Sequence, residues 1–181
     1  MKRLSPTFLF AAAAAAISVL PGCVSQTARL GLPCPVPGVL VDAESASVFR
    51  AGGQGAGDLV YKTTLSSAAV GCDYDTKRRV HTSVSFNMNV ERGPAGAAGK
   101  INVPYFVAVT RGSAILARES FTRTVELTAD PVTKARESID HITIPLAKGL
   151  TGGSYNIVVG LAVSQDQVRY NRTKAIEIPK R

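Results

Sequence analysis

Apolar and polar residues alternate along most of the chain beyond residue 38, and this period of two predicts β-strands. The clearest alternation covers residues 80–90. Its apolar positions, which we expect in a core, are Val80, Val84, Phe86, Met88 and Val90, and its polar positions, which we expect in water, are His81, Ser83, Ser85, Asn87 and Asn89. Residues 59–65 alternate in the same way, with Leu59, Tyr61, Thr63 and Leu65 on one face. Both segments are predicted to be half-buried strands.

Other segments predict further strands. Residues 101–109 are apolar on both faces, as in a central strand, and residues 155–163 form a second strongly apolar segment. Shorter β-prone segments cover residues 39–41, 47–50, 139–146 and 175–178. We expect residues 114–117 and 121–127 to form a hairpin across Arg118-Glu119-Ser120, and the strand at 175–178 to be an edge strand.

Only one local signal predicts a helix. Ser164 is followed three residues later by Gln167, the spacing of a capping box, so we expect a short helix over residues 165–171. About seven to nine short strands separated by glycine-rich or polar loops are typical of an antiparallel β-sandwich. The predicted fold class is therefore all-β, an antiparallel sandwich of immunoglobulin-like topology with one short helix near the C-terminus. A small closed barrel is the alternative.

The N-terminal segment has the pattern of a bacterial lipoprotein signal peptide. Lys2 and Arg3 precede an almost wholly apolar segment, residues 4–20, which ends in Pro21-Gly22-Cys23. We expect residues 1–22 to be removed and Cys23 to be lipidated. The alternatives are a retained transmembrane anchor, for which seventeen residues is near the lower limit, and ordinary cleavage without lipid. Two or more acyl chains such as palmitate hold a protein firmly on a membrane.

These boundaries predict three parts of the chain: the signal peptide, residues 1–22; a lipidated N-terminus and short tether, residues 23–37; and a single sandwich domain, residues 38–181. The tether is rich in proline, which favours an extended backbone. Removal of the signal leaves 159 residues, enough for one domain with a sizeable core.

The cysteine count adds a prediction about pairing. The chain has three cysteines, Cys23, Cys34 and Cys72. If Cys23 carries lipid, two remain, and an exported chain most simply pairs them. We therefore predict a Cys34–Cys72 disulfide. Without Cys-x-x-Cys spacing and with only two distant histidines, the sequence predicts no zinc site and no cofactor.

The charge balance is basic. Lys2 and Arg3 leave with the signal, so 19 basic and 13 acidic residues remain from the 21 and 13 of the full chain. The one basic run, Lys77-Arg78-Arg79, lies in a predicted hairpin turn and is the candidate contact for an anionic lipid, wall polymer or glycan. Simple solubility is the alternative explanation of the charge. An export signal argues against nucleic acid as a partner.

Catalytic patterns are not found in the sequence. It contains no Gly-x-Ser-x-Gly motif, and its glycine-rich segment 52–58 lacks the Lys-Ser/Thr of a phosphate-binding loop. His81 and His141 are predicted to be exposed surface residues. Asp73 and Asp75 are too few for calcium and stand beside three basic residues, so a charged turn is expected. We do not expect an enzyme.

Aromatic residues give little sign of a sugar site, because the chain has no Trp. Tyr61, Tyr105 and Tyr155 fall on strand faces that we expect to be buried. Only Tyr74 and Tyr170 lie where a ring could be free to stack on a sugar.

Several segments, residues 91–95, 103–109 and 155–172, together with the Cys-Pro pair at Cys34 and a later lone cysteine, resemble those of an uncharacterised family of proteobacterial lipoproteins. The resemblance implies an envelope lipoprotein and supplies no catalytic residues. Val24 follows Cys23 in place of the aspartate that retains lipoproteins at the inner membrane of enteric bacteria. We therefore expect the outer membrane, with the domain facing the periplasm.

The functional expectation is a structural or protein-interaction domain, anchored in the membrane by its N-terminal lipid, that contacts another envelope protein. A binding module for an anionic polymer, lipid or glycan is the alternative.

Overall fold

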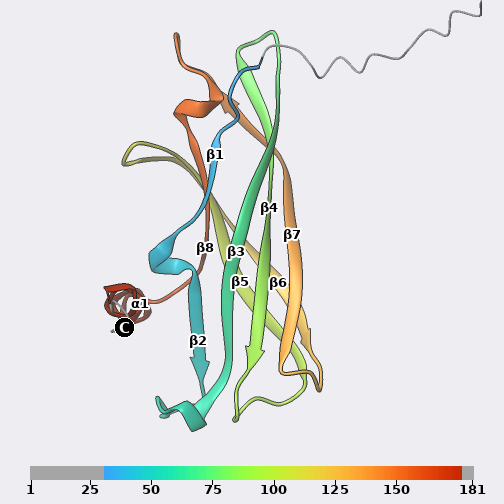
Figure 1. The fold of residues 1–181 in the computed structure, drawn as a ribbon, viewed down its shortest axis with the longest axis vertical. Helices are drawn as coiled ribbons and strands as arrows, with labels where there is room; N and C mark the ends of the chain where they lie inside the picture. The colour runs from blue at the N-terminus through green and yellow to red at the C-terminus, as the bar shows by residue number, and fades with distance from the viewer. Residues whose placement is uncertain (1–30, 177–181) are drawn as a thin grey trace, which may run out of the picture.

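Eight strands form two four-stranded sheets that pack face to face in the computed structural model, which describes residues 31–176, with side chains to residue 172 (Figure 1). The strands are β1 Val36–Val39, β2 Ser45–Phe49, β3 Leu59–Tyr74, β4 Arg79–Arg92, β5 Gly99–Arg111, β6 Ala114–Leu127, β7 Val132–Pro145 and β8 Asn156–Leu161. The order is β1-β8-β5-β6 in one sheet and β2-β3-β4-β7 in the other. One helix, α1 Gln165–Ile176, follows β8. The predicted all-β sandwich with a short C-terminal helix is confirmed.

The core lies between the sheets, where the alternating positions place it. Every apolar residue predicted on the inner face of β4 is at most 1% exposed, from Val80 to Val90. The facing sheet contributes Tyr105 and Val107 from β5 and Ile157, Val159 and Leu161 from β8. As predicted for a central strand, β5 is buried on both faces: its outward-facing Phe106 and Ala108 pack with Ala43 in a second, smaller cluster.

One predicted hairpin is wrong. Residues 114–127 form the single continuous strand β6, and the turn between β5 and β6 lies at Gly112, whose φ of +57° suits glycine. The polar residues Arg118, Glu119 and Ser120 do not break the strand because β6 is the edge of its sheet and is exposed there. Arg118 lies over the ring of Phe106, 4.1 Å from its centre.

The C-terminal segment also differs from the prediction. Helix α1 extends to Ile176, beyond the expected end at 171, and it includes residues 175 and 176, where an edge strand was expected. Residues 177–178 of that strand lie outside the described residues. The Ser164 hydroxyl does cap the helix, since it accepts a hydrogen bond from the Gln167 amide at 3.3 Å.

Helix α1 covers the free edge of β2. The side-chain amide of Gln167 donates to the Ser47 carbonyl at 2.9 Å, and that of Asn171, one helical turn later, donates to the Ser45 carbonyl at 2.8 Å. These bonds occupy carbonyl groups of an edge strand that would otherwise be open to another chain. The Gln167 side chain is thus used for docking the helix.

The connectivity within the sandwich is not that of an immunoglobulin domain. In that fold the last two strands share a sheet, whereas β7 and β8 lie in different sheets here.

Strand β1 pairs with β8 in parallel and begins at Val36, so the domain starts before residue 38, where we placed its boundary. Strands β3 and β7 are also longer than the alternation indicated, because each continues through a bulge.

Candidate functional site at the tether end

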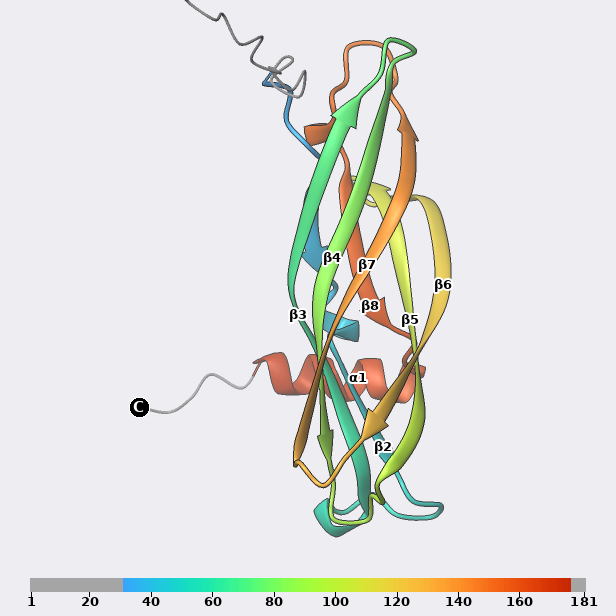
Figure 2. The same ribbon diagram turned by 90° about the vertical axis from the view of Figure 1, so that its right-hand side faces the viewer.

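Three segments meet at one end of the sandwich, which we call the tether end. They are the first described residues, 31–35; the turn between β3 and β4, residues 73–79; and the loop between β7 and β8, residues 145–155. Figure 2 shows the same grouping after a quarter turn, with helix α1 well below it. The predicted basic run and the predicted disulfide both belong to this end.

The disulfide fixes the N-terminal segment to the sandwich. Cys34 and Cys72 are bonded, with their Cα atoms 5.7 Å apart, and the predicted pair is confirmed. Cys34 lies just before β1 of one sheet and Cys72 lies near the end of β3 of the other. The bond therefore ties the two sheets together where the chain enters the domain.

Tyr74 holds the same entry point by hydrogen bonds. Its hydroxyl donates to the Pro33 carbonyl at 2.6 Å and accepts from the Gly152 amide at 2.7 Å. A Cβ atom at Gly152 would stand 2.7 Å from the Pro33 carbonyl oxygen, so this close approach requires glycine. Tyr74 is also partly buried against the core, so its ring is not free in the way that the sequence left open. Tyr170 is 57% exposed, Tyr105 and Tyr155 are buried as predicted, and Tyr61 is partly buried.

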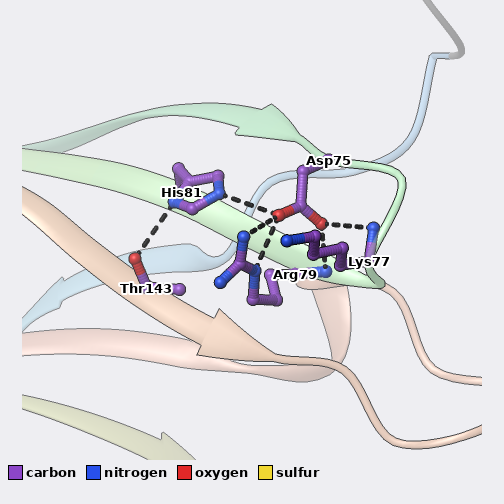
Figure 3. A network of polar contacts seen from close by, with 5 residues as sticks. All are labelled: Asp75, Lys77, Arg79, His81 and Thr143. Atoms are coloured by element: carbon purple, nitrogen blue, oxygen red, sulfur yellow. Dashed lines mark hydrogen bonds and ion pairs between the residues drawn. The ribbon is translucent and has the colours of Figure 1, made fainter.

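Asp75 organises the turn (Figure 3). Its Oδ1 accepts hydrogen bonds from the backbone amides of Lys77 at 2.8 Å and Arg79 at 3.0 Å. Its Oδ2 accepts from Arg79 Nε at 2.6 Å and lies 3.2 Å from His81 Nε2. The other ring nitrogen of His81 lies 3.0 Å from the hydroxyl of Thr143 on β7. The carboxylate thus serves a charged turn, and within residues 31–176 no three metal-ligating side chains are grouped to hold an ion.

This network predicts an acid-sensitive turn. Partial desolvation raises the pKa of Asp75, but the hydrogen bonds from Arg79, His81 and Lys77 together outweigh it and hold that pKa well below the ordinary range. A lowered pKa in the folded state contributes stability above the ordinary value near pH 4, and this contribution is lost as the pH falls below it. We expect the urea midpoint of the wild type to fall more steeply below pH 4 than that of Asp75→Asn. Parallel curves for the two proteins would contradict the prediction.

The predicted basic run is divided by its contacts. Arg79 pairs with Asp75, and Arg78, in the left-handed conformation at φ +59°, donates from Nη2 to the Ala147 carbonyl at 2.8 Å. This bond joins the β3–β4 turn to the β7–β8 loop. Lys77 is exposed, and so is Lys148, beside Ala147. No sequence signal pointed to Lys148, because only the fold brings residue 148 next to residue 78.

The two histidines line one pocket although they are sixty residues apart. The pocket measures about 380 Å³ on the outer face of the β3-β4-β7 sheet and is also bordered by Asp73, Ser83 and Thr143. His141 is exposed, as predicted, and stands at a bulge with φ +67°. His81 is partly exposed, and both of its ring nitrogens already have partners.

A second surface lies along the edge strands β6 and β7, on the side of the sandwich opposite to β1 and β2. Ile115 is 66% and Leu116 48% exposed on β6. Beside them an apolar cleft of about 150 Å³ opens between the sheets, lined by Val107, Val109, Phe121, Ile139 and Ile142 among others.

Below this cleft, Glu137 on β7 accepts a hydrogen bond from the Tyr105 hydroxyl at 3.1 Å and pairs with Arg123 at 3.1 Å. Desolvation and the Glu137 charge raise the pKa of Tyr105, so this hydroxyl keeps its proton and remains a donor. The network joins the two sheets at the lower limit of the cleft.

These features define the class of protein: an all-β sandwich domain in which a disulfide bond joins the two sheets at the point where the chain enters the domain. Comparison with family models, with curated proteins and with solved structures gave no significant match to this chain. Among residues 31–176, no helix has the length and apolarity needed to cross a membrane.

Proposed function

We propose that the protein is a bacterial envelope lipoprotein, anchored by lipid on Cys23, whose sandwich is a non-catalytic structural or protein-interaction domain. The Cys34–Cys72 bond supports an oxidising, exported location. It also uses the two cysteines that remain once Cys23 carries lipid. The resemblance to proteobacterial lipoproteins and the basic-apolar-cysteine pattern of residues 2–23 support the same proposal.

The observation that carries the interaction role is the open edge at β6. Among the described strands β6 pairs only with β5, so the backbone groups on its other side have no strand partner. The exposed Ile115 and Leu116 add apolar surface to this edge. Such an edge can accept an extended strand from another protein, with side chains entering the neighbouring cleft. The edge at β2, in contrast, is covered by α1.

Site-specific photo-crosslinking in cells tests this role. A photoreactive residue at Leu116 is expected to give one reproducible adduct with another envelope protein, and the same probe at Thr128, a turn position, is the control. Ile115→Asp, which adds a charge to the exposed edge, is expected to reduce the adduct at least several-fold. Adducts that are absent, or equal at both positions, would count against an interaction at β6.

A binding module for an anionic envelope polymer, lipid or glycan is the second candidate. The exposed Lys77 and Lys148 at the tether end favour it. Its distinguishing result is cosedimentation with lipopolysaccharide or wall polymer that weakens with salt.

A further inference from the structure

We infer that the tether end is a docking surface for the anionic membrane that holds the lipid anchor. The inference rests on the proposed lipidation of Cys23 and goes beyond it, since it assigns an orientation and named contacts to the anchored domain. The occupant to which it commits is a lipid bilayer surface that carries negative headgroups.

The length of the tether limits how far the tether end can stand from the bilayer. Gly31 is the first described residue of the tether end, and seven residues lie between it and Cys23, so the eight steps from Cys23 to Gly31 span at most about 28 Å. Strands β3 and β4, of 16 and 14 residues, extend along the long axis for roughly 50 Å. A tether of this length keeps the tether end within about 28 Å of the bilayer, so the domain cannot stand inverted, with its far end on the membrane and its tether end about 50 Å above it.

The two ends of the sandwich also differ in their balance of basic and acidic residues. The tether end, defined by residues 31–35, 73–79 and 145–155, carries four basic and two acidic residues. The far end, defined by residues 49–59, 91–100 and 126–132, carries three basic and four acidic residues. The end that faces the bilayer is therefore the one that an anionic surface attracts.

The contacts within the tether end leave cations available to lipid. The two carboxylates of this end are Asp73 and Asp75. Asp75 makes the hydrogen bonds described above, and Arg79 forms an ion pair with it. Lys77 and Lys148 are exposed, and within residues 31–176 neither ammonium group is in an ion pair. The Arg78 bond to Ala147 holds these two lysines on adjoining loops. Leu32, also exposed, adds an apolar side chain to the same end.

Lysine footprinting of the intact lipoprotein in nanodiscs tests the docking. The rate of amine acylation is measured by mass spectrometry in phosphatidylcholine alone and with added phosphatidylglycerol. A basic side chain near an anionic surface contributes roughly a five-fold factor to association, so Lys77 and Lys148 are expected to react about five-fold more slowly in the anionic discs. Lys100 and Lys134, exposed near the far end, serve as internal controls and should be unchanged. High salt should abolish the protection.

Matched variants separate docking from net charge. Lys77→Glu should remove the protection of Lys148, whereas Lys100→Glu, with the same change in net charge, should preserve it. If none of the four lysines differs in acylation rate between the two kinds of disc, the docking proposal is overturned. The intact mass of the disc-bound protein distinguishes the two proposals: an unmodified Cys23 refutes the anchor itself, while a lipidated chain with unprotected lysines refutes only the orientation.

Discussion

Replacing both bridge cysteines, Cys34→Ala with Cys72→Ala, is expected to lower the free energy of unfolding by about 4 kcal/mol. The bond closes a loop with a sequence separation of 38, and a cross-link of that length removes a large share of the conformational entropy of the unfolded chain. A loss of this size is a large fraction of the stability of an ordinary domain.

The position of the bond adds a local effect. Strand β1 has only four residues and, among the described strands, pairs with β8 alone, so the segment before it depends on the disulfide and on the Tyr74 hydroxyl bond to Pro33. Without the bond, β1 is expected to exchange its amide protons before the rest of the sheet. Loss of the bond thus acts first where the chain enters the domain.

Urea denaturation of the full mature protein, followed by intrinsic tyrosine fluorescence, measures the change. The wild type in reductant should approach the stability of the double variant, and reductant should have no effect on the variant itself. Cys23 is retained in both proteins, so the anchor is the same. If the free energies of unfolding of the wild type and the double variant differ by less than about 1 kcal/mol, the bond contributes little to stability.

Much of the fold could be predicted from the sequence because the determining pattern is local. The alternation in residues 80–90 places Phe86 and Met88 inside without any knowledge of partners. The same local reasoning failed for β6, where Arg118 and Glu119 resemble a turn but are tolerated by an exposed edge strand. It also failed for the strand order, since the placement of β7 and β8 in different sheets follows from packing between distant segments.

Local sequence patterns likewise predicted one part of the candidate site and missed another. The Cys34–Cys72 pair could be predicted by counting cysteines, and the charged turn at Asp75 by its neighbours in sequence. The tether end as a surface could not, because it requires Lys148 to lie beside Arg78 through a bond between two loops. The partners of Tyr74 were equally hidden, since Gly152 is 78 residues away.

Phe86→Ala is expected to cost about 3–5 kcal/mol of unfolding free energy, an effect comparable to loss of the disulfide. The Phe86 side chain is 1% exposed at the middle of β4. Its ring meets that of Tyr105 edge-on with centres 5.3 Å apart, and Tyr105 stacks on Phe121 at 5.4 Å. Truncation therefore removes the aromatic contact and leaves a cavity that two fixed neighbours cannot fill.

Tyr105 makes a collapse of that cavity unfavourable. Its hydroxyl is bound to Glu137, which pairs with Arg123, so a movement of the ring toward the space left by Phe86 would break a polar network that joins the two sheets. Phe86→Leu, which keeps most of the volume, should cost clearly less than Phe86→Ala. Phe49→Ala, at a phenylalanine 37% exposed on β2, is the matched control and should change stability only slightly. If the three variants unfold at similar urea concentrations, the aromatic stack does not organise the core as its geometry indicates.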